Sequence, residues 1–174
     1  GNYVQVASQL DEAKLEQPTT AQNSSLVYVA WQNPEEQYSK EIINILRNNR
    51  LWGFNGILYS REKQGAFIRD RPNIVDGRVA MNASELEGML SSREDEGVIY
   101  SEDGSVRFVH FGYKIGEQPA KQLEKNPFVI ALVGKEGAKK LAEVSKNYHL
   151  ESYIHSFKNV DKDMIRFSSL LSVR

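Results

Sequence analysis

Short apolar runs alternate with polar segments along this chain, and the length and period of each run predict an element. Strands are expected over residues 26–31, 54–60, 66–70, 128–133 and 152–157. Helices are expected over residues 34–48, 82–90, 135–148 and 163–171. Because the two kinds of element alternate, we predict an α/β fold with a mixed, twisted sheet of about five to seven strands. Long buried runs place helices on both faces of that sheet.

The first residues differ in composition from the rest of the chain. Residues 2–25 are polar and rich in Gln, Ser and Thr, with a short helix expected over residues 6–16. Residues 1–25 are therefore predicted to be a loosely attached arm, and residues 26–174 a single α/β domain. Within that domain, residues 26–60 are expected to form a βαβ-like unit, because a helix-long crossover permits parallel strands.

A long central β-hairpin is predicted over residues 97–115, where two β-rich runs meet at Asp103-Gly104. This dipeptide favours a two-residue type I′ turn, in which both central residues have positive φ. The alternation of side chains then sets the register. The pairs expected to lie opposite each other are Tyr100 and Arg107, Ile99 and Phe108, and Gly97 and His110.

This register makes Asp95 and His110 candidate catalytic residues. If the strand continues through Gly97 to Asp95, the carboxyl group lies on the same face as the imidazole, diagonally across the ladder. An aspartate in that position can hold one tautomer of the ring and raise the pKa of the histidine. Gly97 opposite the ring would leave space for a ligand. The alternative is a structural histidine at the end of a strand.

Two other segments are candidate anion sites. Gly134, Lys135 and Gly137 lie at the predicted junction of a strand and a helix, where free backbone N–H groups and a lysine can bind an anion. Arg69 and Arg71 end another strand and are suited to bidentate contacts with phosphate. For the first segment, the alternative is that the glycines only reverse the chain. For the second segment, the alternative is a solvated loop with an internal ion pair.

Composition narrows the choice of chemistry. The chain has no cysteine, which excludes disulfides, thiolate catalysis and cysteine-ligated zinc and fits a cytoplasmic protein. It starts at Gly1, so a leader removed earlier stays an open alternative. The net charge of −1 gives no indication of nucleic-acid binding, and the longest apolar run, residues 128–133, is too short to cross a membrane. Neither a Walker A loop nor a GxGxxG motif is present, and no metal or cofactor is predicted.

Residues 63–115 resemble part of the diadenylate cyclase domain. KQGAFI is similar to the family's GALI-type strand, NASELEGML to its following helix, and REDEGVIYSEDGSVRFVHF to the segment in which an Asp-Gly-Ala motif opens a hairpin. That motif would fall on Asp95-Glu96-Gly97 with one inserted residue, and the family's Arg-His-Arg motif has no counterpart downstream. The resemblance implies a degenerate, ligand-sensing or structural relative rather than an active cyclase.

Residues 26–60 also resemble the start of flavin-binding blue-light sensor domains. The matching segments are LVYVAW, a helix ending in RNN, and GFNGILYS, which bring Tyr28 and Asn48 or Asn49 near the family's Tyr and Asn. The glutamine that this photochemistry needs is missing from the next strand, GAFIRD, and the rest of the chain does not continue the match.

Three functions follow from these observations. The leading hypothesis is a domain that binds a small phosphorylated or nucleotide-like ligand without catalysis of its own. The first alternative is an enzyme acting on phosphate esters or nucleotides, with His110 as general acid/base and Asp95 orienting it. The second alternative is a protein-interaction module with no small-molecule site.

Overall fold

The main sheet has six strands in the order β10-β1-β2-β7-β6-β5 in the computed structural model, which describes residues 2–147, 152–154 and 160–170. Every pairing between the described strands of this sheet is antiparallel. The strands, in chain order, are β1 (Leu51–Ser60), β2 (Gly65–Asp70), β5 (Leu90–Asp95), β6 (Val98–Ser101), β7 (Val106–His110) and β10 (Met164–Leu170). The described chain also has two small antiparallel sheets of two strands each. One consists of β3 (Ile74–Val75) and β4 (Arg78–Val79), and the other of β8 (Gly116–Gln118) and β9 (Ser152–Ile154).

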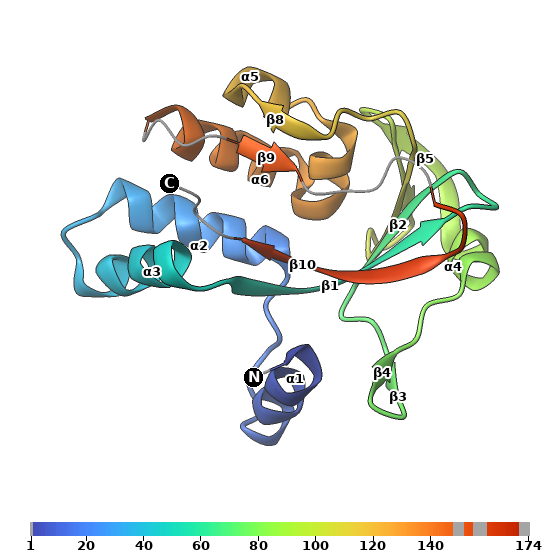
Figure 1. The fold of residues 1–174 in the computed structure, drawn as a ribbon, viewed down its shortest axis with the longest axis horizontal. Coiled ribbons are helices and arrows are strands. Elements are labelled where there is room, and N and C mark those ends of the chain that lie inside the picture. Colours follow the sequence, from blue (N-terminus) through green and yellow to red (C-terminus); the bar gives the residue numbers. More distant parts are fainter. Residues whose placement is uncertain (1, 148–151, 155–159, 171–174) are drawn as a thin grey trace.

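Helices lie on both faces of the main sheet (Figure 1). They are α1 (Tyr3–Glu12), α2 (Thr20–Gln32), α3 (Gln37–Asn48), α4 (Ala83–Met89), α5 (Ala120–Leu123) and α6 (Pro127–Asn147). In Figure 1, α5 and α6 lie above β1 and β10, whereas α1 and the β3–β4 hairpin lie below them. No helix within the described ranges is long and apolar enough to cross a membrane.

Buried side chains of the strands pack in separate clusters on the two faces of the sheet. The larger core joins the sheet to α6 and includes the buried side chains of Ile57, Tyr59, Ile68, Val109, Phe128 and Ile130. On the opposite face, Leu58, Phe67 and Phe108 pack against Leu86 of α4, and Phe54 packs against Tyr3 of α1. The structure therefore confirms an α/β domain with helices on both faces of a sheet within the predicted size range.

Two apolar runs predicted as strands are helical instead. Residues 26–31 belong to α2, and residues 128–133 form the first part of α6. A short apolar run without periodicity fits a buried helix as well as a buried strand. Residues 128–133 are buried against the sheet, whereas Val27 and Trp31 of α2 pack with Val144 of α6. The βαβ-like unit over residues 26–60 is therefore wrong, since its first element is a helix and β1 has antiparallel neighbours.

The last part of the described chain also differs from the prediction, whereas the division into an arm and a domain stays a prediction. The expected boundary between an arm and a domain at residues 25 and 26 falls inside α2, and Tyr3 of α1 is buried. The helix predicted over residues 163–171 is β10 up to residue 170, paired with β1. Of the strand predicted over residues 152–157, residues 152–154 form β9 and the rest lies outside the described residues.

The central hairpin has the predicted register. Tyr100 pairs with Arg107 and Ile99 pairs with Phe108, as the position of Asp103-Gly104 indicates. The turn itself differs, because Gly104 has a φ of 74° whereas Asp103 is not among the residues with positive φ. Asp103 accepts hydrogen bonds from Ser101 and Ser105 instead, and so closes a longer loop with its carboxylate.

Candidate functional site

Asp95 and His110 face opposite sides of the sheet, so the predicted Asp–His pair is wrong. Asp95 pairs with Val98 of β6, which pairs with Val109 of β7, and residues opposite each other share a face. This row faces α6, where the Asp95 carboxylate accepts from Lys135 Nζ at 2.8 Å. His110 follows Val109 and points to the other face, where its ring lies edge-on to Phe108 at 4.9 Å between centroids.

The reason is a second tight turn next to the hairpin. Glu96 and Gly97 have φ values of 51° and 76°, so both central residues of the turn are left-handed. The chain therefore reverses at Gly97, and Asp95 lies on a separate strand, β5, instead of extending β6. Glu96 has a positive φ although it is not a glycine, and the hydrophobic pattern of the sequence does not predict this.

Gly134 lies at a bend of α6, and Gly137 lies one turn further along the helix where α6 contacts α2. Gly134 has a φ of 78° and a ψ of 165°, which interrupts the helix between its two halves. A Cβ on Gly137 would lie 2.9 Å from the Ser24 Oγ of α2, so this glycine permits close contact between the two helices. Gly134 thus separates two helical segments rather than a strand and a helix.

The remaining predicted ligand-binding residues contact groups of the protein itself. Arg69 lies 3.5 Å from a carboxylate oxygen of Glu85 in α4. Arg71 contacts the Glu16 carboxylate and donates to the Gln17 carbonyl oxygen at 2.9 Å, which ties the segment between α1 and α2 to the sheet. The structure does not bring the predicted binding residues together at one site, and their part in binding stays a prediction.

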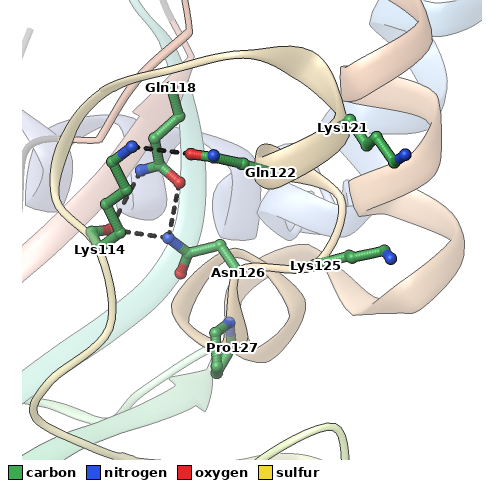
Figure 2. Close-up of a pocket in the computed structure, with 7 residues that line it drawn as sticks. All are labelled: Lys114, Gln118, Lys121, Gln122, Lys125, Asn126 and Pro127. Carbon is green, nitrogen blue, oxygen red and sulfur yellow. Dashed lines mark hydrogen bonds between the residues drawn. The ribbon is translucent and has the colours of Figure 1, made fainter.

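A different place in the fold holds a cavity of about 540 Å³ (Figure 2). It lies where the loop after β7, the end of β8, α5 and the start of α6 meet. Seven residues line it: Lys114, Gln118, Lys121, Gln122, Lys125, Asn126 and Pro127. We call this cavity the lysine pocket. Gly97 is the predicted site residue beside it, since a Cβ there would lie 3.5 Å from Pro127.

Two buried amide side chains stabilise one wall of the lysine pocket. Asn126 Nδ2 donates to the Lys114 carbonyl oxygen at 2.7 Å and to Gln118 Oε1 at 3.1 Å. Gln118 Nε2 donates to the carbonyl oxygens of Lys114 and Gly116, at 3.1 and 3.4 Å. Asn126 Oδ1 accepts from the Phe128 amide at 3.0 Å and so caps α6. These bonds hold the loop of Lys114 against the start of α6.

The three lysines of the pocket have no carboxylate within ion-pair distance among the described residues. Lys114 Nζ donates to the neutral Gln122 Oε1 at 2.7 Å. Elsewhere Lys63, Lys135 and Lys139 each contact a carboxylate at 2.7–2.8 Å. Like charges gathered around one pocket favour the approach of an anion.

Sequence reasoning missed the lysine pocket, although part of its signal is visible. Residues 117–125 are a polar segment in the sequence. Lys121 and Lys125 are four residues apart, a spacing that places side chains on one face of a helix. Lys114 joins them only because the buried amides fix its loop beside α6.

The comparisons with known proteins identify a fold and no family. No family model and no curated protein matches the chain. One solved structure is similar, from work on the accommodation of massive sequence variation in Nanoarchaeota by the C-type lectin fold. The TM-score is 0.57 at 13% sequence identity, and the match covers 90% of this chain and 77% of that chain. This chain has a C-type lectin-like fold.

This result overturns the diadenylate cyclase resemblance. The segment that suggests it, residues 63–115, forms β2, the β3–β4 pair, α4 and β5 to β7 of a domain with a C-type lectin-like fold, and no family model matches. Asp95-Glu96-Gly97, the expected counterpart of the Asp-Gly-Ala motif, includes the Glu96–Gly97 turn. The likeness to flavin-binding sensor domains is wrong as well, because the LVYVAW run is helical and no such family model matches.

Proposed function

We propose that this chain is a binding domain without chemistry of its own, and that it binds a small anion in the lysine pocket. The observation that carries the proposal is the gathering of Lys114, Lys121 and Lys125 around one cavity with no carboxylate partner among the described residues. A cavity of about 540 Å³ is within the usual range for small-molecule sites. The proposed ligand is an anion, as the sequence analysis expects, but the proposed site is the lysine pocket rather than the residues named there.

The alternative of an enzyme using Asp95 and His110 has lost its geometric basis. The two side chains face opposite sides of the sheet, and Lys135 holds the carboxylate of Asp95. The similar structure has a fold that accommodates massive sequence variation, and such a scaffold suits a binding role set by its surface residues. A protein-interaction module and a cytoplasmic location stay predictions.

The proposal is tested by titrating the protein with sodium pyrophosphate at low ionic strength in a calorimeter. Replacing the three pocket lysines with glutamine keeps side-chain length and removes the charges. We expect about 3- to 100-fold weaker binding, since each exposed ion pair contributes roughly 0.2–1 kcal/mol. Higher salt should weaken binding to the unmodified protein, because exposed charges are screened.

The matched control replaces Lys14, Lys146 and Lys162 with glutamine, which changes the net charge equally at exposed positions away from the pocket. This variant should bind pyrophosphate with unchanged affinity. Equal loss in both triple variants would indicate unspecific attraction by total charge. That result, or the absence of any binding heat with the unmodified protein, would contradict the proposed function.

A further inference from the structure

We infer that the lysine pocket selects its ligand by charge density, and that the ligand is a small anion with several phosphate groups and no required aromatic ring. Inorganic polyphosphate and sugars with several phosphates are of this class. The inference rests on the proposed function and narrows it, because the sequence analysis left a nucleotide-like ligand open. Three features of the pocket carry it.

The first feature is the separation of the positive charges. Figure 2 shows Lys114 on one side of Asn126, and Lys121 and Lys125 on the other side. The three side chains come from the loop after β7, from α5 and from the link between α5 and α6. A ligand with several connected phosphates can contact more of these ammonium groups than a single phosphate, and each additional contact strengthens its binding.

The second feature is the hydrogen bonding of the buried amides. Both N–H groups of Asn126 Nδ2 donate to protein oxygens, those of Lys114 and Gln118. Both N–H groups of Gln118 Nε2 also donate to protein oxygens, on Lys114 and Gly116. These amides therefore have no N–H left to recognise the edge of a base. The ammonium groups and the exposed Gln122 amide are the donors available to a ligand.

The third feature is the composition of the pocket walls. The seven lining residues include neither an aromatic ring nor a carboxylate. Tyr113, the neighbour of Lys114, is 6% exposed and its ring stacks on Phe128 at 4.9 Å in the core. Among the described residues, no wall residue offers a ring face on which a base could stack. Lysine is a compact point charge without the planar fork of arginine, so it responds to the number of negative charges.

The test compares orthophosphate, pyrophosphate, tripolyphosphate, ATP and adenosine by calorimetric titration without divalent metal ions. We expect affinity to rise with each phosphate, and tripolyphosphate to bind at least about tenfold more tightly than orthophosphate. ATP should bind within about threefold of tripolyphosphate, since its nucleoside gains no stacking or hydrogen bonds. Lys125→Gln should weaken tripolyphosphate binding more than orthophosphate binding, whereas the control Lys146→Gln should change neither.

The outcomes separate this inference from the proposed function. ATP binding at least about tenfold more tightly than tripolyphosphate, or measurable binding of adenosine, would overturn the inference and leave an anion-binding pocket. Equal affinity for orthophosphate and tripolyphosphate would do the same. Tighter binding of a single-stranded oligonucleotide than of tripolyphosphate would assign the lysines to nucleic acid and overturn the inference. Failure of every anion to bind would overturn both proposals.

Discussion

Arg107 of β7 is the residue whose removal tests the architecture most directly. It is 7% exposed, and its Nη1 lies 2.8 Å from the Asp70 carboxylate. Its Nε donates to the Ala131 carbonyl oxygen at 2.7 Å. In an unbroken helix the Lys135 amide would donate to that oxygen, but the backbone at Gly134 is not helical. Arg107 therefore donates the hydrogen bond that the Ala131 carbonyl oxygen lacks at the end of the first half of α6. It thereby joins this half of the helix to the sheet.

The expected cost of Arg107→Met follows from these contacts. Removing one partner of a buried ion pair costs roughly 3–5 kcal/mol. The lower end applies, because Asp70 is 28% exposed and keeps the hydrogen bond from Asn55. The Ala131 oxygen loses its donor as well, which costs about 1 kcal/mol or more. We therefore expect the free energy of unfolding to fall by about 3–4 kcal/mol.

The assay is equilibrium unfolding in urea, followed by circular dichroism and tryptophan fluorescence. With a slope of about 2 kcal/mol per molar urea, the midpoint should fall by about 1.5–2 M. Arg78→Met is the matched control, because Arg78 lies exposed on β4. It should change stability by no more than about 0.5 kcal/mol. Equal midpoints for the two variants would refute the assignment of Arg107 as the residue that fastens α6.

Two further predictions concern other named groups. Tyr3 is 4% exposed, its hydroxyl has no hydrogen-bond partner among the described residues, and burial raises its pKa to about 12. Tyr3→Phe should raise the free energy of unfolding by about 1 kcal/mol in urea, and a marked loss of stability would contradict the assigned burial. Hydrogen bonds from the Ser105 backbone and from the hydroxyls of Ser101 and Ser105 lower the pKa of Asp103 to about 2, against 3.8 ordinarily. The resulting stabilisation should be present above pH 3.8 and lost as the pH falls toward about 2, so urea midpoints of the unmodified protein and Asp103→Ala should converge there; a constant difference would contradict it.

Local signals in the sequence predict a large part of the fold correctly. The register of the central hairpin follows from the position of Asp103-Gly104 and the alternation beside it. The helix predicted over residues 82–90 exists as α4, where the Asn82 side chain accepts from the Glu85 amide. Both predictions depend on residues near each other in the chain, and here the local preferences agree with the pairing and packing of the tertiary structure.

The errors arise where a local pattern is compatible with two structures. Residues 26–31 and 128–133 are apolar on all sides, and such runs are either buried strands or buried helices. Neighbouring capping residues carry the missing signal. Thr19 and Gln22 form a capping box at the start of α2, and Asn126 caps α6 with Pro127 at its first position.

The candidate site shows a stronger dependence on distant contacts. Asp95 and His110 fail as a pair because a single turn at Glu96–Gly97 transfers Asp95 to another strand. The lysine pocket exists because the loop after β7 returns to the start of α6, where Gln118 and Asn126 hold it. Neither event follows from the spacing of the residues that carry the chemistry.

By itself, the sequence determined the α/β class, the central hairpin with its register, and the size range of the sheet. These properties depend on hydrophobic periodicity and turn residues, which act over a few positions. Only the tertiary structure decided that two apolar runs are helical, that β10 pairs with β1, and that three lysines line one pocket. The physical reason is that burial and pairing between distant segments outweigh the small energy differences among local conformations.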